Sequence, residues 1–527
     1  MNLSPHKRAF IAGTMILTAT GFLSRILGFF YRIFLSRAIG AEGLGIYNMV
    51  HPIFGICFAL CAGSIQTAIS RFTAADPDHA KRTLLSGFSL SFAMSLAAAF
   101  VIRHFSGPLA EHVLMEPRCA PLLSVMAFAI PCTSVHACIC GYYYGKEKVS
   151  VPAAAQLFEQ TIRIFTVFLL VSVCIEKRIP VTVSLAVFGL VAGEAGSALF
   201  VLIFFLLFHE FHENTGRSCR IGQSSIKNPL FRNSERISDL SGNLFSPMSA
   251  LLALAAPLMA NRLILNLLQS AETIMIPERL TVYGLTRSQA VSTYGTLTGM
   301  AMPFVLFPSA LVNSLAVVLL PATARHQSAG NDSGIAAGIS MSFRYSLYLG
   351  IFCIGVFTVF GDVLGLQIFK SQDAGSFIQI LAWLCPFLYL ATSSGSILNG
   401  LGKTKLTFFH HLVSLLVRIA FVWFGIPEFG IRACLWGMLA SEILLSLLHI
   451  LALRRSVSYD WNVWTFIGKP VFCLLCALWI FRLFPEELPI PAGFPDFFRT
   501  AAQVLILSTV YLLFLLFFHR KQDQITS

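Results

Sequence analysis

Two arginines lie inside the first long apolar stretch of the chain. They are Arg25 and Arg32, which are seven residues apart. At 3.6 residues per turn, this spacing places both guanidinium groups on nearly the same face of a helix, close to Gly21, Gly28 and Ser36. Guanidinium forks match phosphate oxygens in a bidentate way. The stripe is therefore a candidate anion-binding face.

Three further arginines lie inside apolar stretches. Arg262 is near Asn266 and Gln269 and is expected to face a cavity. Arg163 follows Glu159 by four residues, a spacing that predicts a structural ion pair on one helix face. Arg418 resembles Arg163 in its surroundings but has a serine where Arg163 has its glutamate.

The balance of charge inside the apolar stretches favours an anion. Their acids are Glu159, Glu194 and Glu442, with no Asp. An intramembrane charge costs about 3 kcal/mol on insertion scales, so such residues usually face a protein interior or a wet cavity. The alternative is that a long side chain reaches the membrane surface. This alternative stays open for Arg32, near the end of its stretch, and more weakly for Arg25.

The elements that position these charges are membrane-spanning helices. Of 527 residues, 56% are hydrophobic and 12% are charged, with a mean hydropathy of +0.75. A soluble domain carries about 25% charged residues. Runs of about 20 apolar residues, long enough to cross a hydrocarbon core of about 30 Å, recur throughout the chain. We predict about fourteen spans, at 9–33, 46–70, 84–103, 120–142, 153–174, 182–208, 247–269, 291–320, 340–360, 375–399, 405–425, 431–453, 465–484 and 499–519.

The basic residues predict the orientation. With the N-terminus inside, 21 of the 37 Lys and Arg residues fall in inside segments and 11 in outside loops. Cytoplasmic loops carry this excess, so both termini are expected in the cytoplasm. The net charge of +12 is then explained by topology, and no nucleic-acid partner is expected.

The two halves of the chain resemble each other. At a shift of 255 residues, Gly145 falls on Gly400, Lys148 on Lys403 and Arg163 on Arg418. Because the shift covers six predicted spans, both copies have the same orientation, related by an axis along the membrane normal. We predict an N-lobe at 1–208, a cytoplasmic basic linker at 209–246, a C-lobe at 247–455 and two C-terminal helices with a tail at 456–527. Two such six-helix lobes are expected to enclose a central cavity.

No pattern predicts catalysis, a cofactor or a metal. Cys473 and Cys476 form a CxxC pair, but within an apolar helix, where small packing residues are expected. No loop is long enough to fold as a catalytic domain. A membrane glycosyltransferase or polymerase would need acidic catalytic residues and a sizeable outer loop, and neither is evident.

The sequence resembles the multidrug/oligosaccharidyl-lipid/polysaccharide (MOP) exporter superfamily, and within it the stage V sporulation protein B group of polysaccharide-biosynthesis flippases. The segments that carry the resemblance are SRILGFFYR at 24–32, GAEGLGIYNMVHPIF at 40–54, YGTLTGMAMPFVLFPSALVNSLAVVLLPATAR at 294–325 and GLGKTK at 400–405. The resemblance implies alternating access and a bacterial cytoplasmic membrane location. It also implies a lipid-linked saccharide as substrate, with cell-wall synthesis proteins as further partners.

The related lipid II flippases carry a similar SR-x-LGF segment, and Arg25 and Arg32 match its two arginines, which are associated there with the substrate cavity. The match is incomplete, because Ile56, Cys57 and Leu297 stand where those proteins have further arginines. The expectation is a flippase that binds an undecaprenyl pyrophosphate through Arg25, Arg32, Arg262 and Arg418.

Two other functions stay open. A cation-coupled multidrug antiporter of the same fold would depend on Glu194 and Glu442 more than on the arginines. A scaffold for a cell-wall complex would transport nothing.

Overall fold

The computed structural model describes residues 5–213, 245–483 and 496–526, and these residues form helices and no β-strand. Within this part of the chain, 11 helices are long and apolar enough to cross a membrane, or up to 13 if each of two bent pairs is one span. The predicted linker at 209–246 lies mostly outside the described residues. The chain is an all-α integral membrane protein, as predicted.

The chain divides into two compact units, of which the first contains Met1–Leu27 and Met49–Ser270. It contains the two ends of α1 (Pro5–Phe58) without its middle part, and the first part of α9 (Phe245–Val282). Between them lie α2 (Ser64–Ala75), α3 (Ala80–His104), α4 (Ser106–Pro108), α5 (Ala120–Met126), α6 (Ala129–Gly145), α7 (Ser150–Glu176) and α8 (Ser184–Glu213). Helix α6 packs against α2, α3 and α8, and α7 packs along α8. Ile65, Ile69 and Tyr142 belong to the apolar core of this unit.

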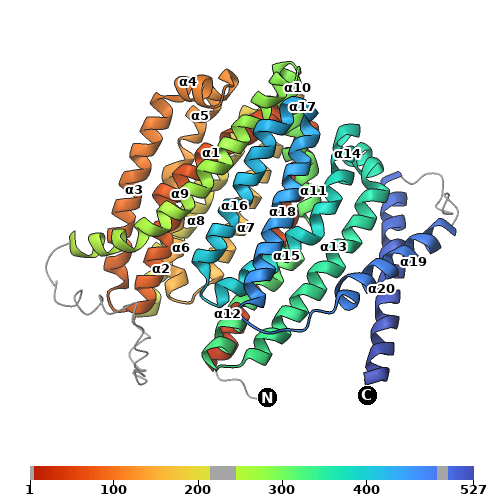
Figure 1. Ribbon diagram of the computed structural model, residues 1–527. Coiled ribbons are helices and arrows are strands. Elements are labelled where there is room, and N and C mark those ends of the chain that lie inside the picture. The colour runs from red at the N-terminus through yellow and green to blue at the C-terminus, as the bar shows by residue number, and fades with distance from the viewer. Residues whose placement is uncertain (1–4, 214–244, 484–495, 527) are drawn as a thin grey trace. The chain divides into compact units, whose positions relative to one another are not determined.

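The second unit contains Gly28–Asn48 and Ala271–Ser527. Its helices are the remaining parts of α1 and α9, then α10 (Arg287–Gly295), α11 (Met302–Leu306), α12 (Ser309–Ser328), α13 (Asp332–Phe369), α14 (Gln372–Leu381), α15 (Cys385–Gly400), α16 (Thr404–Ala420), α17 (Ile426–Phe429), α18 (Ile431–Arg454), α19 (Lys469–Leu483) and α20 (Asp496–Thr526). Helix α13 packs against α14 and α15, and α19 and α20 also pack against it (Figure 1).

Large apolar side chains project from the helices without protein cover. Phe100 is 70% exposed, and Phe165 and Leu207 are each 65% exposed. Exposure of so much apolar surface to water would be unfavourable, whereas lipid tails solvate it. The exposed faces thus match the membrane location.

Glycine and π-helical turns interrupt the long helices. Gly40 has φ of +70°, a conformation that glycine adopts without the steric penalty of a side chain. It breaks α1, and the stretch Met15–Ala75 of 61 residues contains the predicted span at 46–70 and most of the one at 9–33. Ala59–Gly63 and Thr296–Ala301 are π-helical turns. Such turns are rare and frequently occur at functional sites.

Each predicted span overlaps one or more helices, but the spans at 120–142 and 291–320 fall on helix pairs bent by 43° and 59°. Other differences lie in length. Helix α9 runs to Val282 rather than ending at 269, and α13 covers Asp332–Phe369 rather than 340–360. The number of fourteen spans and the symmetry axis stay predictions. The compact units also have other boundaries than the predicted lobes, because 28–48 belongs to the second unit and 247–270 to the first.

A close contact between helices in the second unit provides a stability test. A Cβ on Gly295 would overlap the carbonyl oxygen of Ala41. Gly295→Ala should therefore lower the free energy of unfolding by about 1–3 kcal/mol, the usual effect of overpacking. Thermal unfolding of the purified protein in detergent measures this loss. Gly338→Ala is the matched control, since a Cβ there meets nothing within 4 Å; equal stability of the two variants would contradict the close contact.

Candidate functional site

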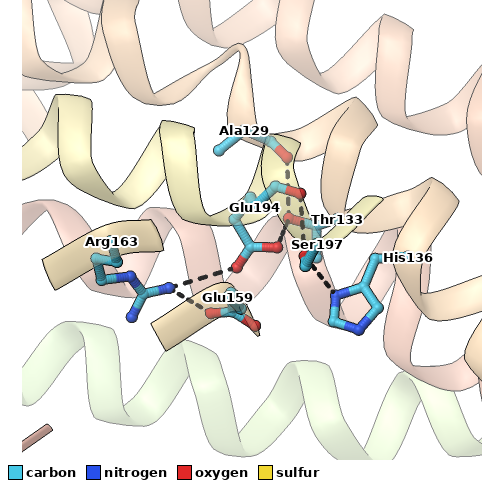
Figure 2. A network of polar contacts seen from close by, with 7 residues as sticks. All are labelled: Ala129, Thr133, His136, Glu159, Arg163, Glu194 and Ser197. Atoms are coloured by element: carbon cyan, nitrogen blue, oxygen red, sulfur yellow. Dashed lines mark hydrogen bonds and ion pairs between the residues drawn. The ribbon is translucent and has the colours of Figure 1, made fainter. Parts of the chain in front are cut away.

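A buried polar network lies inside the first unit, where α6, α7 and α8 each contribute two side chains (Figure 2). The pairs are Thr133 and His136, Glu159 and Arg163, and Glu194 and Ser197. Members of a pair are three or four residues apart, so both lie on one face of their helix. Three helices that turn such faces toward one another build the network.

Arg163 holds the two acids of the network. Its guanidinium forms an ion pair with Glu159, and its Nη2 lies 3.8 Å from Oε1 of Glu194. The side chain of Glu194 is only 8% exposed. The spacing in the sequence predicts the first pair but does not bring Glu194 to it. One guanidinium faces two carboxylates, so the network has one excess negative charge when His136 is neutral.

Two hydroxyl groups complete the network. Thr133 Oγ1 lies 2.9 Å from Glu194 Oε2 and 2.9 Å from the carbonyl oxygen of Ala129. Ser197 Oγ lies 3.1 Å from Nδ1 of His136 and 3.1 Å from the carbonyl oxygen of Glu194. Because a hydroxyl has one proton and can also accept, each of them can donate to either neighbour.

A cavity of about 370 Å³ opens beside this network. It is lined by Phe54, Gly55, Phe58, Gln66, Thr133, His136, Ala137, Glu159 and Glu194. The ligand atoms of His136, Glu159 and Glu194 all lie within 4.8 Å of one another. The cavity wall is mostly apolar but includes five polar side chains, and a cavity of this size has room for water. His136 is absent from the sequence prediction, and its only signal there is an imidazole inside an apolar stretch.

Arg25 is one of the two exposed arginines of the predicted set. Its side chain is exposed, and it has no hydrogen bond or ion pair among the residues that the structure describes. A Cβ added to Gly21, one turn earlier, or to Gly28, one turn later, would meet nothing within 4 Å. The predicted stripe is thus open at Gly21 and Gly28, whereas its Ser36 is buried.

Arg262 is also exposed, and its contacts are with uncharged groups. Its Nη2 donates to Thr67 Oγ1 at 3.3 Å. A Cβ on Gly63 would overlap its Nη1, so the guanidinium lies directly against the π-helical turn before α2. One turn along α9, Asn266 donates to the carbonyl oxygen of Gly55 at 3.1 Å. No carboxylate pairs with Arg262 among the described residues.

Arg32 is half-buried and belongs to the second unit. Its Nη1 donates to the carbonyl oxygen of Thr298 at 3.3 Å, and Asn48 donates to the Thr298 hydroxyl at 2.9 Å. Thr298 is part of a π-helical turn, where the backbone hydrogen bonding is altered. The alternative in which Arg32 reaches along lipid to the membrane surface does not fit this bond within the protein.

Arg418 has a carboxylate partner on another helix, which its own sequence neighbours do not predict. Its Nη2 lies 2.7 Å from Oε2 of Glu272, whose side chain is 7% exposed. Glu272 lies just beyond the predicted span at 247–269, but α9 continues past it. Arg418 is thus compensated from another helix and not from its own, where Ser414 replaces the glutamate.

The fold of the chain is that of known membrane transporters. It aligns with the solved structure of lipid II flippase MurJ in an inward closed conformation, with a TM-score of 0.68 and 14% identity, over 97% of this chain and 100% of that one. It also aligns with an inward-facing multidrug resistance MATE family transporter of the MOP superfamily, with a TM-score of 0.61 and 12% identity, over 84% of this chain and 98% of that one.

The chain belongs to the polysaccharide biosynthesis protein family, whose profile matches residues 10–327. It is 25% identical over 528 residues to stage V sporulation protein B of Bacillus subtilis (strain 168), covering 98% of this chain and 97% of that protein. These similarities confirm the family resemblance predicted from the sequence.

Removal of Arg163 should leave two buried carboxylates close together without a counter-charge. We expect Arg163→Gln to lower the free energy of unfolding by about 3 kcal/mol, as for the loss of one partner of a buried pair. Unfolding in lipid-detergent micelles measures it. The double variant Arg163→Gln, Glu194→Gln should regain part of the loss; if it is no more stable than the single variant, repulsion between the acids is not the cause.

Proposed function

We propose that this chain is a flippase that moves a lipid-linked saccharide across the bacterial cytoplasmic membrane by alternating access, with both termini in the cytoplasm. The proposed substrate is an undecaprenyl-pyrophosphate-linked oligosaccharide or peptidoglycan precursor. Support comes from the family, from the flippase fold and from the excess of arginine inside the membrane spans. The prediction that cell-wall synthesis proteins are partners stays open.

The observation that carries the proposal is the pair Arg25 and Arg262. Both belong to the first unit, both are exposed within membrane-spanning helices, and neither has a carboxylate partner among the described residues. An uncompensated guanidinium in a membrane helix is expensive unless water or an anion reaches it. A diphosphate supplies the compensating charge and accepts bidentate hydrogen bonds.

Arg32 and Arg418 support the proposal less strongly. Arg32 already binds the Thr298 carbonyl oxygen, and Arg418 is paired with Glu272. We propose that Arg25 and Arg262 form the primary contact with the diphosphate. Arg32 is a secondary contact, and Arg418 is least suited to the role because its charge is already balanced.

The membrane potential favours the proposed direction of transport. With the cytoplasm negative, outward movement of an anion gains about 2.3 kcal/mol per charge for each 100 mV. A head group that keeps some negative charge during transfer is thus driven toward the outer leaflet without any chemical step. No covalent intermediate is part of this mechanism.

A cation-coupled multidrug antiporter remains the second candidate. The observation in its favour is the cavity that contains Glu159 and Glu194, because buried acids beside a cavity suit an organic cation. This function predicts that export of a cationic dye depends on the acids and is indifferent to Arg25.

Arg25→Ala tests the proposed function. Loss of a charge-assisted hydrogen bond costs about 1.5–3 kcal/mol, so the flipping rate should fall at least about tenfold. The measurement is the leaflet accessibility of a defined polyprenyl-pyrophosphate sugar in vesicles that contain the purified protein. Arg103→Ala is the control, because Arg103 lies at the end of α3 against the ring of Phe128. A wild-type rate in Arg25→Ala, with normal protein levels, would exclude the proposed anion contact.

Gly63→Ala tests the position of Arg262. The added methyl group would displace the guanidinium from the π-helical turn. We expect flipping to decrease in Gly63→Ala about as much as in Arg262→Ala. The double variant should be no slower than Arg262→Ala alone, since both changes remove the same contact. Additive losses would show that Gly63 acts in another way.

A further inference from the structure

We infer that the network of Glu194, Glu159 and His136 is a binding site for a single proton, whose occupancy is set through the cavity beside it. The inference goes beyond the proposed function, which needs no coupling ion. It concerns a different set of residues from the arginines that are proposed to bind the diphosphate.

The first argument is the charge of the network. Glu159 and Glu194 carry two negative charges, and Arg163 supplies one positive charge. A net charge held inside a membrane protein is costly. Uptake of one proton, which we place on Glu194, makes the network neutral. The stoichiometry of one follows from the residues present.

The second argument is that the hydrogen bonds fit both protonation states. With Glu194 ionised, Thr133 donates to its Oε2; with Glu194 protonated, the acid donates to Thr133, whose own proton turns to the Ala129 carbonyl oxygen. Ser197 has the same choice between His136 and the Glu194 carbonyl oxygen. Neither state leaves a hydroxyl proton without an acceptor, so the proton can enter and leave at small cost.

The third argument selects a proton over a metal ion. Hard cations such as Ca²⁺ take six or more oxygen ligands, whereas this site offers two carboxylates and an imidazole. Arg163 occupies the space next to both acids and would repel a cation there. The excess charge of one also does not match a divalent ion. A proton needs no coordination shell, and its single charge matches the excess charge of one.

Few charged groups face Glu194 among the residues that the structure describes. The titratable or charged groups that face it are His136 and the Cys132 thiol on α6, and Glu159 and Arg163 on α7. From α1 and α2 the cavity is lined by Phe54, Gly55, Phe58 and Gln66. The protonation of the network therefore depends mainly on its own charged groups.

The segment 55–67, part of which lines the cavity, also forms hydrogen bonds with α9. Gly55 accepts a hydrogen bond from Asn266, and Thr67, next to Gln66 of the cavity wall, accepts one from Arg262. The π-helical turn Ala59–Gly63 lies between these two points. If the proposed function holds, protonation would act on the diphosphate site through this stretch and make flipping depend on pH.

Infrared difference spectroscopy of the full-length protein in lipid vesicles tests the site without any substrate. A pH change should produce the carbonyl band of a protonated carboxylic acid in the wild-type protein. Glu194→Gln keeps the size of the side chain and should remove that band. Glu442→Gln is the matched control, because Glu442 is the corresponding acid of the second half, and it should keep the band.

Three results would overturn the inference. One is a wild-type spectrum that matches the spectrum of Glu194→Gln at every pH. A second is a band that only Glu442→Gln removes. The third is a carboxylate signal that responds to Na⁺ against choline but not to pH, which would assign the site to sodium. Because no substrate is used, a failure here leaves the test of Arg25 unaffected, and a failure of that test leaves this one unaffected.

Discussion

A charge inside a membrane must be neutralised, hydrated or carried to the surface, and this constraint sorts the arginines of the protein. Arg163 pairs with Glu159 on its own helix, and Arg418 pairs with Glu272 on another helix. Arg32 binds a backbone carbonyl oxygen in a π-helical turn. Only Arg25 and Arg262, among the predicted arginines, need water or a ligand. The same constraint applies to the network of Glu194, where two carboxylates face one guanidinium and negative charge is in excess.

The sequence predicts most of the fold because lipid leaves few alternatives. Backbone groups in a bilayer must bond within their own helix, so an apolar run of sufficient length indicates a span. An apolar run does not indicate the full length of a helix that contains polar residues. The segment with Asn266, Gln269 and Glu272 lowers the hydropathy of α9, so the predicted span stops early although the helix runs to Val282. Glu272 then falls outside the predicted span, although its side chain is buried.

The candidate site is predictable only where its contacts are local. Glu159 and Arg163 are four residues apart, and that spacing alone implies their ion pair. The contacts of Glu194 with Thr133 and Arg163, and of Glu272 with Arg418, join different helices. They depend on which helices are neighbours and on their rotation, and a periodic apolar pattern specifies neither. His136 could not be predicted for the same reason, because its contacts are with residues of other helices.

The internal repeat shows which arginines belong to the scaffold. Arg163 and Arg418 match at a shift of 255 residues, yet their partners differ. Where the first half has Glu159, the second has Ser414, which donates to a backbone carbonyl oxygen, and Glu272 on α9 supplies the carboxylate. The same charge is thus compensated from two different helices, which is the behaviour of a structural pair. Arg25 and Arg262 do not match each other at that shift, and both lie in the first unit. At that shift Arg25 falls on Leu280, so its charge has no counterpart in the other half, which suits the proposed single diphosphate better than a symmetric arrangement would.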